Sequence, residues 1–510
     1  MNRDKYPAKT VAVLGTGSDV GKSIVTAALC RIFREGGQSV APFKAQNMSN
    51  NSFVTKDGGE MGRAQVVQAE AAGIEPHVDM NPVLLKPSSD TGAQVVLQGE
   101  VVGNSEAAHY FKNTDYLFGK ARESLNRLRS KYDLVIMEGA GSCAEMNIRD
   151  RDFVNFRMAK VAEAPVILVA DIDRGGVFAQ IIGTLNIIPE EDRRMVKGII
   201  INRFRGDAAL FDDGIKYIEK KTGIPVLGLI PYFRHIEIDS EDGLPLDIII
   251  DPSTPLDSEK INIAVLRLPH ISNFTDFAPL SRDPGVTLHY LSRGRDIKGY
   301  DLLIIPGTKN ARFDMAWMRD VGWERYIADY SESGGHICGI CGGYQMLGNI
   351  IRDPQGIEGS QGETVCLKFL DIETTLEPDK ILSRSKGTFM ESGIEVEGYE
   401  IHHGLTKRGE WVKPLIRLDS RSGNNSTEDD GAINEDGRVW GTYLHGLFDN
   451  NEFRKVFLKG LSPKYSGSDS ADSQIAFKDR QYGLLAEHFR EYLNMERLNE
   501  IIGINQNRRS

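Results

Sequence analysis

The sequence contains little cysteine, no long apolar run and no excess of positive charge. Its five cysteines are an odd, scattered set between Cys30 and Cys366, which predicts reduced intracellular thiols and not a disulfide framework. No uncharged apolar run approaches the roughly 20 residues that cross a bilayer, and the first residues show no secretory signal. We therefore expect a cytoplasmic protein with no membrane partner.

The charge composition argues against a nucleic-acid partner. The 61 Lys and Arg are outnumbered by 72 Asp and Glu, which gives a formal net charge of -11. No block of basic residues with interleaved aromatics stands out, as a nucleic-acid surface would require. We expect small-molecule substrates, and a homo-oligomer is compatible with this composition.

Short aliphatic runs, each ending at a Gly, Asp or Pro, indicate an α/β protein. Such runs are apolar on both faces and suit buried parallel strands, and the stretches between them are long enough for crossover helices. Ligands in these sheets bind at the carboxyl ends of the strands. The runs are Val11 to Leu14, Leu134 to Met137, Val166 to Ala170, Gly198 to Ile201, Ile261 to Leu268 and Leu302 to Ile305.

The chain of 510 residues is long enough for about three compact units. A stretch rich in charge and proline separates two groups of predicted strands, and a Ser-rich loop precedes a final predicted helix around Phe477 to Leu498. We expect a first domain over residues 1–235, a linker over 236–260, a second domain over 261–450 and a C-terminal loop and helix over 451–510.

A glycine-rich loop, GTGSDVGKS, follows the first apolar run and precedes a helical pattern. In such loops the backbone N–H groups surround phosphate oxygens, the lysine reaches the β- and γ-phosphates and the serine binds Mg²⁺. The spacing departs from GxxxxGK[ST], because Thr16 stands at the first Gly position, and a purely structural turn is the alternative. The predicted ATP-binding residues here are Thr16, Gly17, Asp19, Val20, Gly21, Lys22 and Ser23.

Charged residues also follow the neighbouring predicted strands. Glu138 ends the run Leu134 to Met137 and is placed to bind Mg²⁺ directly or through water. Asp173 is a candidate ligand or substrate contact, although Asp is also a common helix N-cap. Lys44 is a candidate for charge neutralisation near the phosphoryl acceptor, with an ordinary solvated lysine as the alternative.

Cys341 lies where a strand pattern turns through glycines into a helix pattern. Such a turn exposes a nucleophile at a helix N-terminus, where the thiol pKa falls and backbone N–H groups can hold an oxyanion. His445, in GTYLHG, is the predicted base. Cys338 and Cys341 also form a CxxC, so a redox pair, half a zinc site or a structural cysteine are the alternatives.

Together these features suggest that one half activates a carboxylate with ATP while the other releases ammonia from an amide. The sequence resembles the cobyric acid synthase family through most of its length, and FKAQNMSNNS and LPHISNFTDF are more specific than the phosphate loop. Other matching segments are GEMGRAQ, EGAGSCAEMN, VADIDRGGVFA, INRFRGD, PGTKN, GICGGYQMLG, GYEIHHG and GTYLHGLF.

The resemblance implies a P-loop, dethiobiotin-synthetase-like ATP-binding domain followed by a class I glutamine amidotransferase domain of flavodoxin-like topology. It implies ATP and Mg²⁺ as cofactors, and amidation of the b, d, e and g carboxylates of adenosylcobyrinic acid a,c-diamide with ammonia from glutamine.

By the same resemblance, Cys341 is the nucleophile and His445 its base. The implied oxyanion hole involves Gly307 and Gly342, Asn202 lies near the adenine, and Lys44, Asn47 and Asp173 contact the acceptor. General class I amidotransferases commonly carry a Glu two residues after the His, where this chain has Leu447. The family shares that departure, and Glu400 is one candidate to orient the imidazole.

Three alternatives stay open at this point. The nearest is the a,c-diamide synthase of the same pathway, against which the FKAQNMSNNS segment argues. A second is a related ligase that acts on a non-corrinoid acid. The third is a ParA-like or regulatory ATP-binding protein with an inert hydrolase domain.

Overall fold

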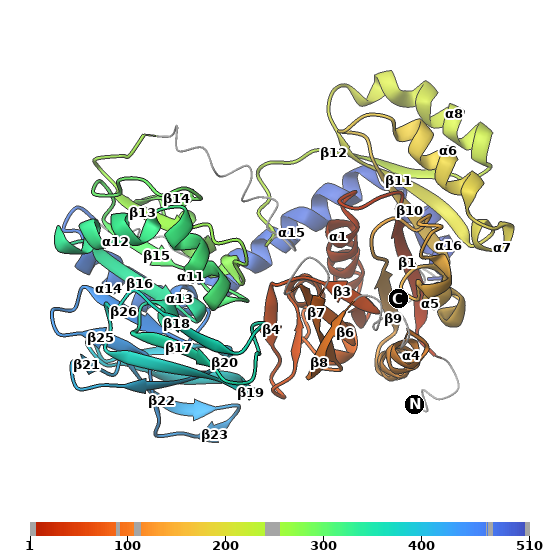
Figure 1. The fold of residues 1–510 in the computed structure, drawn as a ribbon. Coiled ribbons are helices and arrows are strands. Elements are labelled where there is room, and N and C mark those ends of the chain that lie inside the picture. The colour runs from red at the N-terminus through yellow and green to blue at the C-terminus, as the bar shows by residue number, and fades with distance from the viewer. Residues whose placement is uncertain are drawn as a thin grey trace.

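The protein has two α/β lobes side by side, and its C-terminal helices return to the first lobe (Figure 1). The computed structural model describes residues 7–87, 92–106, 114–239, 255–465, 467 and 473–504. Part of the expected linker, residues 240–254, lies outside the described residues. None of the helices in these ranges has the length and apolar character that crossing a membrane requires.

The N-terminal lobe is built on a parallel sheet in the order β12-β11-β10-β1-β9-β2. The aliphatic runs predicted from the sequence form its central strands, and this prediction is confirmed. The strands are β1 (Lys9–Gly15), β2 (Val40–Phe43), β9 (Leu134–Glu138), β10 (Val166–Asp171), β11 (Val196–Phe204) and β12 (Val226–Pro231).

Helices cover both faces of this sheet because its strands are apolar on both faces. Val11 and Val13 pack with α1 and the C-terminal helices, whereas Ala12 and Leu14 belong to the core beneath α4, α5 and α6. The helices of this lobe are α1 (Lys22–Glu35), α2 (Arg63–Ala72), α4 (Thr114–Lys131), α5 (Phe156–Ala162), α6 (Val177–Ile187), α7 (Glu190–Arg193) and α8 (Asp212–Thr222).

An insertion between β2 and α4 carries two small sheets that the sequence reading missed. Its strands are short and partly polar, so they lack the aliphatic signature of the central sheet. One sheet contains β3 (Gln46–Met48), β6 (Val83–Pro87), β7 (Gly92–Leu97) and β8 (Glu100–Glu106); the other is the hairpin of β4 (Ser52–Val54) and β5 (Glu60–Gly62).

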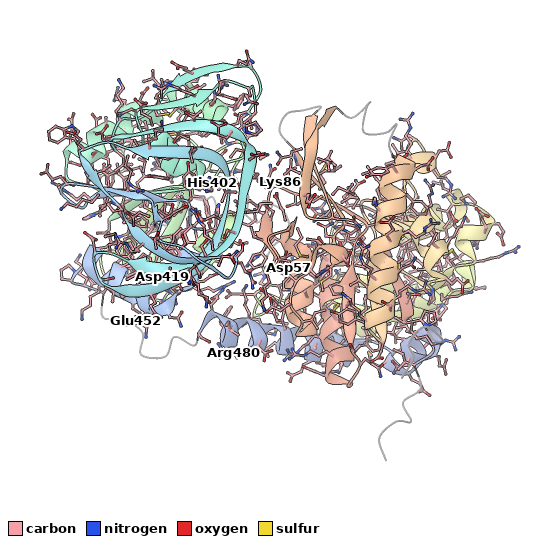
Figure 2. The ribbon with its side chains drawn as sticks, turned by 90° about the horizontal axis from the view of Figure 1, so that it is seen from below. Asp57, Lys86, His402, Asp419, Glu452 and Arg480 are labelled. Atoms are coloured by element: carbon pink, nitrogen blue, oxygen red, sulfur yellow. The ribbon has the colours of Figure 1, made fainter. Side chains whose placement is uncertain are left out.

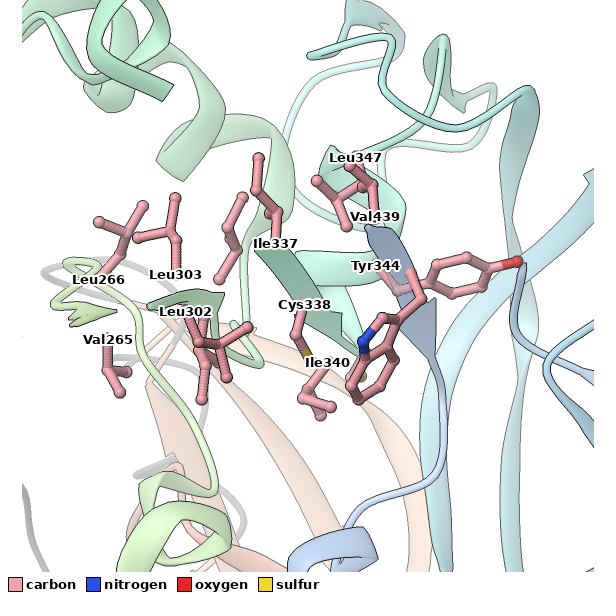
Figure 3. Close-up of a cluster of buried hydrophobic side chains, with 14 of the residues drawn as sticks. Val265, Leu266, Leu302, Leu303, Ile337, Cys338, Ile340, Tyr344, Leu347 and Val439 are labelled. Atoms are coloured by element: carbon pink, nitrogen blue, oxygen red, sulfur yellow. The ribbon is translucent and has the colours of Figure 1, made fainter. Parts of the chain in front are cut away.

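The second lobe has a sheet in the order β14-β13-β15-β16-β26-β25-β21, parallel from β14 to β26. Its core is a layer of buried aliphatic side chains around β13, β15 and β16 (Figure 3). The strands are β13 (Ile261–Leu266), β14 (Val286–Leu291), β15 (Leu302–Ile305), β16 (His336–Ile340), β21 (Val412–Lys413), β25 (Ala432–Asn434) and β26 (Val439–Thr442). The helices of this lobe are α10 (Ala278–Ser281), α11 (Ala311–Asp320), α12 (Trp323–Glu332), α13 (Gly342–Met346) and α14 (Asn451–Leu461).

A second sheet in this lobe is dominated by the long antiparallel pair β19 and β20, which faces the N-terminal lobe (Figure 1). Polar and apolar residues alternate along it because one face is solvated. Its strands are β17 (Ile350–Asp353), β18 (Gly362–Val365), β19 (Ile372–Phe389), β20 (Ile394–Arg408), β22 (Ile416–Arg421), β23 (Asn424–Asn425) and β24 (Asp429–Asp430).

The last described part of the chain, residues 473–504, forms two helices where the sequence predicted a single helix around Phe477 to Leu498. α15 (Gln474–Tyr492) ends before Leu493, and α16 (Met495–Ile502) begins after Asn494, whose side chain caps it by accepting from Arg497 N. Asn494 N also donates to Leu227 O at 2.7 Å, so the break between the helices is fixed against β12. Both helices pack on the N-terminal lobe beside α1.

The packing of α15 predicts that the C-terminal segment stabilises the N-terminal lobe. Phe489 is fully buried against the central sheet, so Phe489→Ala should lower the free energy of unfolding of this lobe by about 3–5 kcal/mol. Urea denaturation followed by circular dichroism measures the change. Ile475→Ala, on the same helix but 79% exposed, is the control and should stay within about 0.5 kcal/mol of wild type. Equal losses in the two variants would contradict the assignment.

Candidate functional site: a phosphate loop and a thiol on an elbow

The glycine-rich loop leaves β1 and enters α1, as its sequence predicted. Thr16 N donates to Val169 O at 2.9 Å and so begins the loop against β10. Gly21, the residue before α1, has φ 92°, and a Cβ there would lie 2.2 Å from Nδ2 of Asn202. Only glycine meets both constraints, because L side chains avoid this φ and the Asn202 amide occupies the space.

Lys22 spans the loop. Its Nζ donates to Gly17 O at 2.9 Å and to Gly141 O at 2.8 Å. The ammonium is therefore held between the phosphate loop and the segment that follows β9, at the N-terminal end of α1. This is the position from which a lysine neutralises phosphate charge.

The carboxylate of Glu138 is the centre of a buried hydrogen-bond network at the end of β9. Its Oε1 accepts from Ser23 Oγ at 2.8 Å and Lys44 Nζ at 2.9 Å, and its Oε2 accepts from Gln68 Nε2 at 2.5 Å. The structure thus brings together three predicted site residues, Ser23, Lys44 and Glu138, and adds Gln68 from α2.

The oxygen atoms of Ser23 and Glu138 fit a shared Mg²⁺. The edge of an octahedron with 2.1 Å bonds is roughly 3.0 Å, close to the 2.8 Å between Ser23 Oγ and Glu138 Oε1. Within the described ranges, no group of three or more His, Cys, Asp and Glu side chains could hold a metal. Mg²⁺ in phosphoryl-transfer sites commonly takes one or two protein ligands and completes its shell with phosphate oxygens and water.

The other predicted site residues of this lobe, Asn202, Asn47 and Asp173, differ in how far they are buried. Asn202 Nδ2 donates to Val20 O at 3.0 Å and so supports the phosphate loop from the end of β11. Asn47 is buried and donates to Gln65 Oε1 at 3.2 Å. Asp173 is more peripheral, in an exposed ion pair with Arg205 at 2.6 Å.

In the second lobe, Cys341 occupies the predicted sharp turn between β16 and α13. It has φ 51° and ψ −109°, a strained conformation for a residue with a side chain. The turn is pressed against the loop after β15: a Cβ on Gly342 would lie 2.5 Å from Cγ2 of Thr308, and one on Gly343 would lie 1.9 Å from Ile305 O. The glycines therefore permit the close approach that sets Gly342 beside the segment containing Gly307.

His445, just beyond β26, lies over the same loop. A Cβ on Gly307 would lie 3.1 Å from His445 Cε1. Burial disfavours the charged imidazole, but Asp276 and then Cys341 more than offset burial and raise the pKa of His445 to about 10. Its Nε2 is buried and has no hydrogen-bond partner of standard geometry in the described part of the chain, so it is available to a reacting group beside Cys341.

Asp276 is the functional residue that the sequence reading missed. Its Oδ2 lies 2.6 Å from Nδ1 of His445, and its Oδ1 accepts from Gly446 N at 3.2 Å. Glu400, the candidate considered from the sequence, instead binds Ser385 and Arg421. Asp276 lies within LPHISNFTDF, a segment singled out for its specificity, but no local spacing connects it to a histidine 169 residues away.

The CxxC alternatives receive no support from the geometry. Cys338 is fully buried within β16, and burial raises the pKa of its thiol well above its usual range. All five cysteines are unpaired. The two histidines of GYEIHHG face opposite sides, as a strand requires: His402 stacks on Tyr443, and His403 Nε2 lies 3.3 Å from Gln94 Nε2.

Comparison with known proteins matches both lobes to described families. Residues 11–246 match the CobQ/CobB/MinD/ParA nucleotide binding domain, and residues 262–453 match the CobB/CobQ-like glutamine amidotransferase domain. A protein named cobyric acid synthase from Chlorobium phaeobacteroides strain BS1 is 56% identical over 97% of this chain and 99% of its own. Proteins of the same name from Chlorobaculum tepidum, 54% identical over 97% of this chain and 98% of theirs, and Syntrophobacter fumaroxidans, 45% identical over 98% and 99%, are also similar.

The contact between Asp276 and His445 predicts a change in pH dependence. Below its raised pKa of about 10 the imidazole of His445 is charged, and it loses that charge as the pH rises through this value. Asp276→Asn removes the largest favourable cause, so the charge is lost at lower pH. The titration of the His445 ring nitrogens, followed by NMR of protein with ¹⁵N-labelled histidine, should therefore move to lower pH.

Asp283→Asn is the matched control. Asp283 is also buried on the following segment but binds Tyr465 Oη at 2.6 Å and not His445. Its titration profile for His445 should coincide with that of wild type. A profile unchanged in Asp276→Asn would show that Asp276 does not set the charge state of His445.

Proposed function

The chain belongs to the cobyric acid synthase family, and we propose that it amidates the b, d, e and g carboxylates of adenosylcobyrinic acid a,c-diamide, with ATP to activate each carboxylate and glutamine to supply nitrogen. The observation that carries the proposal is the presence of two complete centres in one chain. One is a phosphate loop with a buried carboxylate at Glu138, and the other is a strained thiol at Cys341 beside a buried His–Asp pair.

The first centre suits phosphoryl transfer to a carboxylate. Such reactions depend on positioning and on neutralising the charge of the transferred group. The loop amides and Lys22 would bind the phosphates while a substrate carboxylate attacks the γ-phosphate in line, releasing ADP and forming an acyl phosphate. Mg²⁺ held by Ser23 and Glu138 would supply further charge neutralisation at the β- and γ-phosphate oxygens.

The second centre suits hydrolysis of the glutamine side-chain amide. The thiolate of Cys341 would attack the amide carbon, and N–H groups near Gly307 and Gly342 would stabilise the oxyanion. His445 would give its proton to the departing nitrogen, with Asp276 holding the imidazolium, and ammonia would leave. Water then clears the glutamyl thioester, while the ammonia displaces phosphate from the acyl phosphate.

The remaining assignments concern binding. Lys44 directly follows β2 and pairs with Glu138, and Asn47 is buried in β3 and donates to Gln65 of α2, the helix that also carries Gln68. These positions support a role near the acceptor carboxylate. Asp173 would contact the acceptor from the rim, and Asn202, at the base of the phosphate loop, would lie near the adenine. The use of ATP and glutamine, which are intracellular metabolites, supports action in the cytoplasm.

The proposal is tested by mass spectrometry of a mixture of corrinoid acids incubated with the protein, ATP, Mg²⁺ and either glutamine or ammonium. Wild type should add amides to the a,c-diamide with either donor. Cys341→Ala should lose synthesis with glutamine by a factor on the order of 10³ or more and keep synthesis with ammonium, because only glutamine requires the thiol.

The outcomes test the identity of the substrate separately from the use of ATP and glutamine. If the a,c-diamide is untouched while ATP and glutamine are consumed, the substrate assignment is wrong and the two-centre chemistry stands. If Cys341→Ala keeps its activity with glutamine, the thiol assignment is wrong. Cys338→Ala, three residues earlier and buried in β16, is the control and should retain both activities.

A further inference from the structure

The two centres lie in different lobes, yet one short segment of the N-terminal lobe touches both. This segment is the β4–β5 hairpin and the helix α2 that follows it without interruption, Ser52 to Ala72, here called the hairpin–helix segment. Its hairpin contacts the second lobe beside β19 and β20, and its helix reaches the phosphate loop. Figure 2 shows Asp57, in the hairpin turn, and Lys86 on the side of the N-terminal lobe that faces the other lobe.

The first strand of the hairpin contacts the loop that carries Asp276. Ser52 N donates to Oδ1 of Asn273 at 3.0 Å, and both residues are buried. Asn273 has φ 52° and begins the short helical turn Phe274–Phe277 that contains Asp276. A hydrogen bond from the N-terminal lobe therefore fixes the strained residue from which the acid partner of His445 is positioned.

The same strand also supports the imidazole through an aromatic side chain. Phe53 packs against Tyr399 with 5.1 Å between ring centroids, and Tyr399 stacks on His445 at 5.2 Å with 17° between the planes. The backbones of Tyr399 and His445 also exchange hydrogen bonds of 3.1 and 2.8 Å. Tyr399 is thus held between His445 on one side and Phe53 of the other lobe on the other.

The second strand of the hairpin is tied across the interface by buried charges. Glu60 is fully buried and accepts from Lys86 of its own lobe at 2.7 Å and from Lys380 of β19 at 2.6 Å. Breaking a buried pair of this kind leaves an uncompensated charge, which is strongly destabilising. The hairpin is therefore anchored to the surface of the second lobe by Glu60 and Lys380.

The helix end of the segment reaches the phosphate centre. Gln68 of α2 is fully buried, and its Nε2 donates to Glu138 Oε2 at 2.5 Å and lies 3.5 Å from Ser23 O. A Mg²⁺ ion shared by Ser23 and Glu138 would replace their direct hydrogen bond and change the charge that Gln68 faces. If α2 has a second position, a ligand that binds one position better than the other shifts the equilibrium between them.

We propose that the hairpin–helix segment couples the two centres, so that a nucleotide and Mg²⁺ at Ser23 and Glu138 change the reactivity of Cys341 through Gln68, Phe53 and Ser52. This inference rests on the proposed function, because it takes Glu138 and Cys341 as the two reacting centres. The physical basis is that packed elements shift as units, since interfaces and cores have discrete packing arrangements and deform little between them.

The test measures how fast the full-length protein is labelled at Cys341 by the diazoketone analogue of glutamine, with and without Mg²⁺ and adenylyl imidodiphosphate. Labelling requires neither a corrinoid nor phosphoryl transfer, so its rate measures the reactivity of Cys341 alone. We expect the Mg²⁺ nucleotide to raise the wild-type labelling rate by at least about fivefold, the lower end of typical coupling between two sites. The nucleotide is added at a concentration that a separate binding titration shows to be saturating for each variant.

Two variants remove the segment's contacts at opposite ends. Phe53→Ala removes the support behind Tyr399, and Gln68→Met keeps the volume of the side chain but removes the donor to Glu138. Both should lose the nucleotide response, and thermal unfolding checks that each is folded. Phe53→Leu, with less volume lost, is the substitute if Phe53→Ala does not fold.

Phe118→Ala is the matched control. Phe118 and Phe53 are both half-buried with an arginine over the ring: Arg157 lies 4.0 Å from the Phe118 ring, and Arg384 lies 5.1 Å from the Phe53 ring. Phe118, however, packs on Phe153 within the N-terminal lobe. It should keep the response. The coupling proposal is overturned if the wild-type rate does not change with nucleotide, if Phe53→Ala or Gln68→Met keeps the response, or if Phe118→Ala loses it.

The labelling result is independent of the corrinoid assignment. If no corrinoid gains an amide but labelling responds to nucleotide as expected, the proposed substrate fails and the coupling stands. If corrinoid amidation proceeds with glutamine but labelling is insensitive to nucleotide in wild type, the proposed function stands and the coupling fails.

Discussion

The short contact between Asp276 and His445 is the interaction on which the thiol centre depends. His445 is buried, and without a counter-charge burial would favour the neutral imidazole. Asp276 reverses that preference and, by bonding to Nδ1, directs Nε2 toward the thiol. The strained turn at Cys341 and the glycines beneath it position the sulfur. In the proposed reaction, the buried pair of Asp276 and His445 would supply the proton for the leaving nitrogen.

The phosphate centre is organised in a similar way around Glu138. In each lobe a carboxylate with little solvent access lies on the carboxyl side of a parallel strand: Glu138 is the last residue of β9, and Asp276 follows β13. Glu138 pairs with Lys44, and Asp276 pairs with His445. This is the edge where doubly wound sheets place their ligands. Each centre therefore uses a carboxylate that is largely removed from water and binds other groups of the protein.

The features predictable from the sequence were those that a short stretch encodes. The aliphatic strands, the loop ending in Lys22 and Ser23, and the strand-to-helix turn at Cys341 all read correctly because periodicity and glycines specify them locally. Asp276 was missed because its role exists only when the loop after β13 meets the end of β26. The β4–β5 hairpin could not be predicted for a related reason. The roles of Phe53 and Glu60 depend on Tyr399 of β20 and Lys380 of β19, which lie hundreds of residues away in the sequence.

The position of the acid also explains how an amidotransferase centre works with leucine at residue 447. Leu447 is buried in the core of the second lobe, so a carboxylate there would lose its water without gaining the imidazole. An acid two residues after the histidine would be held by the same short segment as the histidine itself. Asp276 instead sits on a separate loop, and that loop begins at Asn273, whose side chain accepts from the other lobe. The orientation of His445 therefore depends on the contact between the two lobes. Through this contact, one centre can influence the other.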